Sequence, residues 1–156
     1  MKLNASILFI SLFFSATLMA QSMKTWSWTT YKMQFQAPSN FKVDKNNAEI
    51  FDAGNGDLHL TIYPEKGNNI TESSMKGLLK TWAKENKLKF DGSVETMEDL
   101  NGYWGVYVDG VANDLPTTIL LLVDPDYPNI SFYVWLQYDA ELEDTAVKIL
   151  KSFIPS

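Results

Sequence analysis

The sequence contains no cysteine, and its 13 basic residues are all lysines, so arginine is absent as well. It has a single histidine, His59. Without cysteine the chain has no disulfide, no thiol nucleophile and no thiolate ligand for a metal. Without arginine it lacks the planar cation that binds phosphates and carboxylates through two parallel hydrogen bonds. These absences leave one imidazole ring for most of the nucleophilic, metal and phosphate chemistry that proteins use.

Positive charge is scarce throughout the chain. The 13 basic residues stand against 19 acidic ones, which gives a net charge of −6. Binding to nucleic acid needs clustered cations that neutralise phosphates, and an anionic membrane surface attracts basic segments in the same way. The composition therefore argues against a protein that binds nucleic acid and against one that binds acidic membranes.

A mainly apolar block from Ile7 to Phe14 follows the positively charged Lys2 near the N-terminus. The block is shorter than the ~20 residues that a membrane-spanning helix needs, and Ala20 provides a cleavage point. Residues 1–20 are therefore predicted to be a secretory signal peptide, with no cysteine after them to carry a lipid anchor. We expect a secreted or periplasmic protein with no stable membrane insertion after signal cleavage.

The remaining residues, 21–156, are expected to form a single domain. A chain of this length buries roughly two thirds of the surface that it exposes when unfolded. An exported protein of this size can therefore be stable without disulfides, and the absence of cysteine is compatible with export.

Alternating apolar and polar residues predict strands in the first half of this domain. From Tyr31 to Ala37 the apolar side chains share one parity. Residues 48–54 and 57–63 are predicted to form a hairpin, because Gly54, Asn55 and Gly56 between them tolerate positive φ. In the second arm His59 lies on the side opposite to the leucines next to it.

The middle of the chain combines a helix with three further strands. The apolar period becomes that of an amphipathic helix from Thr71, its predicted N-cap, to about Lys87. Residues 94–100 and 103–111 are predicted to form a hairpin with Asn101 and Gly102 as a two-residue type I′ turn, and its acidic first arm is expected at a sheet edge. Residues 117–123 are apolar at both parities, which predicts a central strand covered on both faces.

The C-terminal part adds one strand and one helix. Residues 130–138 alternate, so that Tyr133 and Trp135 lie on one face while the other face is expected to be buried under a helix. Residues 139–153 are predicted to be a helix that Asp139 caps, with acidic residues in its first turn and lysines near its end. Short turns between the strands predict an α+β fold, with a largely antiparallel, twisted sheet of about six or seven strands and helices packed on it.

Four segments carry a resemblance to a known family: YKMQFQAPSNF at 31–41, AEIFDAGNGDLHLTIYP at 48–64, EDLNGYWGVYVDG at 98–110 and KILKSF at 148–153. Their order, over about residues 26–154, resembles the PsbP-like superfamily. That group includes the extrinsic photosystem II protein PsbP, a Ran-binding yeast protein and DcrB-type bacterial envelope proteins. The resemblance implies an α/β/α sandwich around an antiparallel sheet, used as a binding or accessory domain; a fold-level likeness transfers no specific function.

His59 is the first candidate for chemistry. A zinc site or a general base needs convergent partners, and the chain offers no second histidine and no cysteine. It also lacks the G-x-S-x-G turn that presents a serine nucleophile. We expect His59 to be an ordinary strand residue that faces solvent or a polar rim of the sheet, and we predict no catalytic residue, no metal site and no cofactor.

Two groups of oxygen-bearing side chains are weaker candidates. Asp124, Asp126 and Asn129 could offer ligands to a hard cation such as calcium. The segment lacks the glycine and the distal glutamate of a calcium loop, so a hairpin turn is the favoured interpretation. Glu95 and Glu98 could act as a glycosidase pair only if one carboxyl with a raised pKa faced an ionised partner in a cleft.

The candidate ligand-binding residues are the aromatic side chains of Trp26, Trp28, Tyr133 and Trp135. Exposed aromatic rings in a secreted protein can hold sugars or peptides, because their faces are apolar and their edges are polar. The alternative is that these rings pack in the core and in cross-strand pairs.

These observations predict an exported, non-catalytic binding or accessory domain whose partner is an unidentified protein or small ligand of the cell envelope. A small hydrolase that uses carboxylates in a groove and a structural subunit of an envelope assembly are the alternatives. Ionisable groups that converge in one pocket would favour the hydrolase, whereas a large apolar patch would favour the structural subunit.

Overall fold

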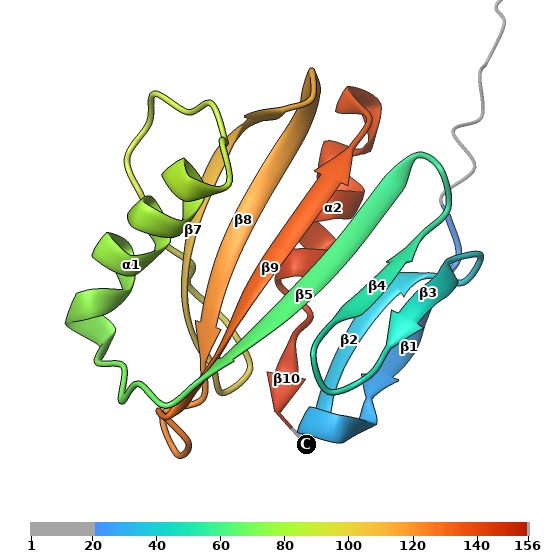
Figure 1. The fold of residues 1–156 in the computed structure, drawn as a ribbon. Helices are drawn as coiled ribbons and strands as arrows, with labels where there is room; N and C mark the ends of the chain where they lie inside the picture. The colour runs from blue at the N-terminus through green and yellow to red at the C-terminus, as the bar shows by residue number, and fades with distance from the viewer. Residues whose placement is uncertain (1–20, 156) are drawn as a thin grey trace, which may run out of the picture.

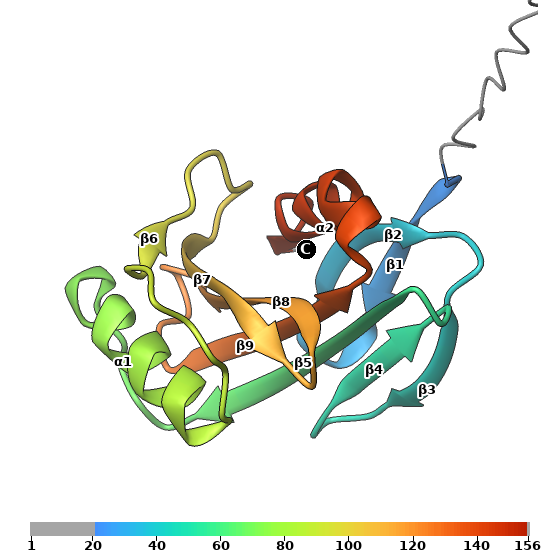
Figure 2. The same cartoon turned by 90° about the horizontal axis from the view of Figure 1, so that it is seen from above.

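The computed structural model describes residues 21–155, and the predicted signal peptide at residues 1–20 lies outside the described residues. A long seven-stranded sheet forms the middle layer. Helix α1 lies on one of its faces, and helix α2 lies with a three-stranded sheet on the other (Figure 1 and Figure 2). Every strand pair in both sheets is antiparallel. The α+β fold and the strand number of the main sheet are confirmed.

The long sheet has the strand order β3-β4-β5-β9-β8-β7-β6. Its strands are β3 (Lys42–Asn46), β4 (Phe51–Gly54), β5 (Leu58–Lys66), β6 (Glu95–Thr96), β7 (Trp104–Ala112), β8 (Leu115–Val123) and β9 (Ile130–Tyr138). The second sheet has the order β1-β2-β10 and consists of β1 (Met23–Trp28), β2 (Met33–Pro38) and β10 (Ile154–Pro155). The helical elements are η1 (Thr29–Tyr31), α1 (Glu72–Glu85), η2 (Ala140–Leu142) and α2 (Glu143–Leu150).

The long sheet separates two hydrophobic clusters. Phe132 and Val134 of β9 point to the side of α2 and the three-stranded sheet, whereas Tyr133 points to the side of α1. Strand β8 is buried throughout residues 117–123, as predicted for a central strand. Its apolar residues occupy both parities because both of its faces are covered.

Three strands have no counterpart in the sequence predictions: β1, β3 and the two-residue β10. Strand β1 pairs with β2 from Met23 to Trp28 and makes the tryptophan segment part of the second sheet. All five residues of β3 are exposed, so no buried face imposes an apolar alternation on them. Strand β3 is an edge of the long sheet, and β6 is the other edge, as expected for the acidic arm.

The predicted two-residue turn at Asn101 and Gly102 is wrong. Strand β6 pairs with β7 only at Glu95 and Thr96, so a long loop connects the two strands. The two-residue turn instead lies between β7 and β8, where Asn113 and Asp114 both have positive φ, at 51° and 63°. Asparagine and aspartate tolerate this conformation better than most residues other than glycine, which allows a type I′ turn without glycine.

The helix ends differ in detail from the predictions. Thr71 does precede α1, but its side chain does not bond to the helix backbone. The predicted helix at 139–153 is divided into η2 and α2, and Asp139 likewise makes no side-chain cap. Within residues 21–155 no helix is long and apolar enough to cross a membrane.

Candidate functional site

Part of the long sheet has no helix from residues 21–155 over it. Helix α1 packs mainly against β7 and β8, whereas the start of β5 and its neighbours β4 and β3 extend past α1 on that side (Figure 2). Asp52 of β4 pairs with Thr61 of β5, which pairs with Trp135 of β9, so these side chains share one face. We call this surface the open face; its residues are Asp52, His59, Thr61, Tyr63, Trp82 and Trp135.

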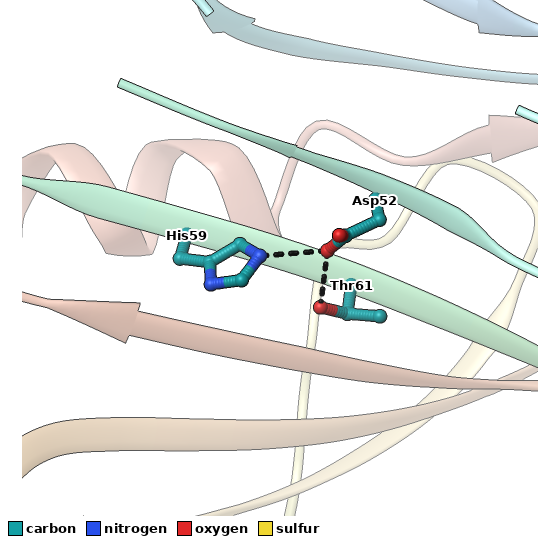
Figure 3. Close-up of polar contacts among 3 residues, drawn as sticks. All are labelled: Asp52, His59 and Thr61. Carbon is teal, nitrogen blue, oxygen red and sulfur yellow. Dashed lines mark hydrogen bonds and ion pairs between the residues drawn. The ribbon is translucent and has the colours of Figure 1, made fainter. Parts of the chain in front are cut away.

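At its polar end, Asp52 holds two neighbouring side chains (Figure 3). Its Oδ1 atom lies 2.7 Å from Nε2 of His59 and accepts a 2.9 Å hydrogen bond from the hydroxyl of Thr61. The His59 side chain is 54% exposed, whereas that of Asp52 is only 17% exposed, and Thr61 is buried. The imidazole ring is thus exposed, as expected, and its orientation is fixed by a carboxylate.

The order of these three groups differs from that of a Ser-His-Asp triad. In a triad the histidine lies between the carboxylate and the nucleophilic hydroxyl, so that it can accept the hydroxyl proton. Here Asp52 lies between His59 and Thr61, and among residues 21–155 no hydroxyl is bonded to the imidazole ring. The arrangement orients a hydrogen-bonding ring on the surface and does not activate Thr61.

At its apolar end, the open face is built around Trp82 of α1. The Trp82 ring stacks on Tyr133 with centroids 4.8 Å apart, and it stands edge-on to Trp135 at 6.0 Å. Tyr63 lies 5.9 Å from it on the outer side and is 39% exposed. Trp82 and Trp135 are each half-buried, so parts of both indole rings and the Tyr63 side chain are open to solvent.

Two tyrosines of this region have raised pKa values. Burial raises the pKa of Tyr133 to about 12, and the charges of Glu65 and Glu85 add to the effect. Burial also raises the pKa of Tyr63, together with the negative charge of Asp52. Both phenols remain protonated at neutral pH and can donate a hydrogen bond.

The four predicted ligand-binding residues do not form one exposed groove. Trp28 is fully buried on the α2 side of the sheet, where its indole N–H donates a 2.9 Å hydrogen bond to the carbonyl of Asn47. Trp26 is half-buried on that side as well, with the ammonium of Lys24 above its ring. Tyr133 is only 3% exposed because Trp82 covers it. Trp28 and Tyr133 are therefore not exposed and pack in the core, as the alternative interpretation has it, and of the four residues only Trp135 lies on the open face.

Sequence reasoning missed four residues of the open face, namely Asp52, Thr61, Tyr63 and Trp82. No pattern in the sequence marks Asp52 as a site residue, because His59 and Thr61 become its neighbours only when β4 and β5 pair. Trp82 lies three residues after the buried Leu79 of α1, so the apolar stripe of that helix accounts for the tryptophan without a role in binding. Tyr63 shares the parity of His59, which was the one available indication that both side chains point to the same face.

The DPDYPN segment forms a turn, in agreement with the favoured interpretation. The Asp124 carboxylate accepts a hydrogen bond from the backbone N–H of Asp126 at 2.9 Å, and the Asp124 carbonyl accepts one from the N–H of Tyr127. Among the described residues, no group of three or more histidine, aspartate or glutamate side chains is placed to hold a metal ion.

A second cleft, of about 290 Å³, lies between α2 and the β6–β7 edge of the long sheet. Glu98, Asp109 and Glu143 all line it. The Asp109 carboxylate accepts a 2.5 Å hydrogen bond from the hydroxyl of Thr118, which in turn lies 3.2 Å from the hydroxyl of Tyr138. Three carboxylates and the ammonium of Lys151 thus line one cleft, and of the acidic residues only Glu98 is a candidate from the sequence.

No family model matches the chain, and no curated protein matches it in sequence. Solved structures do match. Cyanobacterial PsbP from Synechocystis sp. PCC 6803 has a TM-score of 0.55 at 12% identity, with 90% of this chain and 96% of that chain covered. The Ran-binding protein Mog1p from Saccharomyces cerevisiae has a TM-score of 0.53 at 7% identity, with 87% and 96% covered.

A protein from Bacteroides thetaiotaomicron VPI-5482 has a TM-score of 0.51 at 13% identity. The match covers 87% of this chain but only 48% of that longer one. At such low identity these similarities establish the fold alone. The chain therefore has the PsbP-like fold that its order of elements predicts.

Proposed function

We propose that the protein is an exported, non-catalytic binding domain of the cell envelope that holds its ligand on the open face. The observation that carries this proposal is the exposure of Tyr63 and His59 beside the half-buried Trp82 and Trp135, at the margin of α1 where the sheet extends past that helix. Aromatic rings next to oriented polar groups are typical of ligand-binding surfaces.

A glycan is the ligand class that suits this surface. A sugar ring has an apolar face, which packs on aromatic rings, and a rim of hydroxyls, which the His59 ring and the Asp52 carboxylate can bind. An extended peptide would instead pair with a free sheet edge. The free edge at β3 carries Lys42, Asp44 and Lys45 and has an irregular register between Val43 and Lys45, features that discourage strand addition.

The test is a binding titration of the protein beginning at Gln21 with two probes, an N-acetylglucosamine tetramer and a soluble digest of peptidoglycan. Tryptophan fluorescence and calorimetry provide the readouts. We expect saturable binding of at least one probe, and Tyr63→Ala and Trp135→Ala should each weaken it by about tenfold, as truncation of a central aromatic contact does.

The matched control is Tyr127→Ala, because Tyr127 is the most exposed large hydrophobic residue of the described part of the chain and lies outside the open face. It should bind both probes as the unmodified protein does. Failure of the unmodified protein to bind either probe, or undiminished binding by Tyr63→Ala, would contradict the proposal.

The carboxylates in the cleft beside α2 favour one alternative, a small hydrolase. Glycosidases use two carboxyl groups across a cleft, and Glu98, Asp109 and Glu143 line this one. Hydrolysis of the same glycan probes, followed by chromatography, tests this function. Activity that is lost in Asp109→Asn and Glu143→Gln, with unchanged thermal stability, would favour the hydrolase over the binding domain.

A further inference from the structure

A pocket of about 330 Å³ lies where the two sheets meet, away from the open face. Residues from η1, from β10, from the start of β9 and from the 124–129 turn line it. These elements gather around the C-terminal end of the described chain, at the bottom of Figure 1. A volume of this size is at the lower end of the range of small-molecule sites, roughly 300–1,000 Å³.

The walls of this pocket are largely aromatic. Tyr31 and Tyr103 each stand edge-on to Phe132, with ring centroids 5.3 and 6.4 Å apart. The hydroxyl of Tyr31 donates a 2.5 Å hydrogen bond to the carbonyl of Ala48, which fixes the ring. The rings belong to segments far apart in the chain, so the pocket exists only in the folded protein.

The hydroxyl of Tyr103 is the distinctive group in this pocket. Tyr103 is only 7% exposed, yet among residues 21–155 its hydroxyl makes no hydrogen bond. Tyr138 is also 7% exposed, but its hydroxyl lies 3.2 Å from that of Thr118. Among the described residues, the only fully buried side-chain polar atom without a partner is Oε1 of Gln21, so the unbonded hydroxyl of Tyr103 is accessible from the pocket. Tyr103 therefore places a hydrogen-bonding group in the pocket that the rest of the fold does not use.

The ionisation state of Tyr103 makes this hydroxyl a donor. Burial raises its pKa well above 10, and the negative charge of Asp124 raises it further. The phenol consequently stays protonated at neutral pH and can donate to an acceptor atom of a ligand.

The charges around the pocket favour a neutral ligand. Lys32 and Asp124 both line it and carry opposite charges, so the lining has no excess of either sign. The Asp124 carboxylate already accepts a hydrogen bond from its own turn. The Lys66 ammonium lies 5.2 Å from the centroid of the Tyr31 ring. A cation of the chain itself is thus already paired with that ring, and a cationic ligand is not needed there.

We infer that this pocket binds a small, neutral, ring-bearing molecule that accepts a hydrogen bond from the hydroxyl of Tyr103. The ring of the ligand packs among Tyr31, Tyr127 and Phe132. Tyr127 forms the outer wall: its side chain is 65% exposed, while its backbone is fixed by hydrogen bonds to Asp124 and from Ile130. This site is separate from the open face and does not depend on the function proposed for that surface.

The test uses two probes of similar shape, acetophenone, which has a carbonyl acceptor, and ethylbenzene, which has none. Binding is followed by NMR on protein with isotope-labelled tyrosine rings. We expect saturable shifts of the Tyr103 and Tyr127 signals with acetophenone. Tyr103→Phe keeps the ring and removes the hydroxyl, so it should weaken acetophenone binding by about fivefold, the value of one typical hydrogen bond, and leave ethylbenzene binding unchanged.

Two further variants complete the design. Tyr107→Phe removes the hydroxyl of a β7 tyrosine that does not line this pocket, so this variant should bind both probes as the unmodified protein does. Tyr127→Ala removes the outer wall and should weaken the binding of both. Thermal melting verifies that each variant is folded. The inference is overturned if acetophenone shows no saturable binding to the unmodified protein, or if Tyr103→Phe affects the two probes equally.

Discussion

Asp52 and His59 are joined across the β4–β5 pair by a 2.7 Å contact between Oδ1 and Nε2, although they are not directly opposite each other. Thr61 is the residue opposite Asp52, and its hydroxyl bonds to the same oxygen. Asp52 therefore supports both a buried hydroxyl and an exposed ring. Removal of Asp52 should therefore lower the stability of the fold, whereas removal of the exposed His59 ring should affect mainly ligand binding.

Asp52→Ala is expected to destabilise the protein more than His59→Gln. Loss of the carboxylate leaves the buried Thr61 hydroxyl without its acceptor, which costs about 1–3 kcal/mol. Loss of the exposed imidazole costs less than about 1 kcal/mol, as surface substitutions generally do. Urea denaturation measures both free energies of unfolding, and an equal or larger loss in His59→Gln would contradict the assigned roles.

The two faces of β9 should respond differently to truncation. Phe132 is 4% exposed and touches the rings of Trp28 and Tyr31, so Phe132→Ala should cost ~3–5 kcal/mol. Trp135 is half-buried against Trp82, and Trp135→Ala should cost roughly half as much because less surface returns to water. Thermal melting of both variants checks the order; equal losses would mean that Trp135 is as much a core residue as Phe132.

The turn between β7 and β8 should tolerate only residues that accept positive φ. Asp114 has a φ of 63°, so Asp114→Val, which introduces a β-branched side chain there, should destabilise the protein by about 1–2 kcal/mol. Asp114→Gly is the matched control and should be at least as stable as the unmodified protein, since Asn-Gly is the favoured pair in a type I′ turn. A stable Asp114→Val variant would show that the turn has another conformation.

Alkaline pH should destabilise the protein partly through Tyr133. Its pKa is raised to about 12 in the folded state, whereas tyrosine in an unfolded chain ionises near pH 10. The folded state thus holds this proton more tightly, and the resulting stability, on the order of 2 kcal/mol, is complete below pH 10 and is lost as the pH rises towards 12.

Denaturation curves between about pH 9 and 12 test this effect on the unmodified protein and on Tyr133→Phe. The phenylalanine variant keeps the ring that stacks on Trp82 but has no proton to lose. Its stability should fall less steeply over this range, and parallel curves for the two proteins would contradict the prediction.

Export remains a prediction from the sequence. Because Ile7–Phe14 forms the apolar block and Ala20 the cleavage point, protein recovered from the envelope or the medium should begin near Gln21. Intact-mass measurement checks the N-terminus. Recovery of a chain that begins at Met1 from the cytoplasm would contradict the signal-peptide assignment.

Several elements followed from the sequence because a local rule governs them. Apolar residues at both parities identified β8 as central, alternation separated Phe132 from Tyr133, and a helical period located α1. Strand β3 carried no such signal, since all of its residues are exposed. The preference of the Asn-Gly dipeptide for a type I′ turn is a local rule, and it led to the wrong prediction at Asn101 and Gly102. The turn lies at Asn113 and Asp114 because β7 and β8 pair as far as Ala112 and Leu115, and the sequence carries no local signal for this pairing.

The sequence by itself determined the chemistry that is available: no thiol, no guanidinium, one imidazole, many aromatic rings and an acidic surface. It also determined the fold class, because hydrophobic periodicity and turn residues act over a few neighbouring positions. Only the tertiary structure decided which rings are exposed, since α1 covers Tyr133 and the long sheet buries Trp28 of β1 against Phe51 and Phe132. It alone brought Asp52 to His59 and placed the unused hydroxyl of Tyr103 in a pocket, because such contacts join residues from separate elements and leave no pattern in the chain.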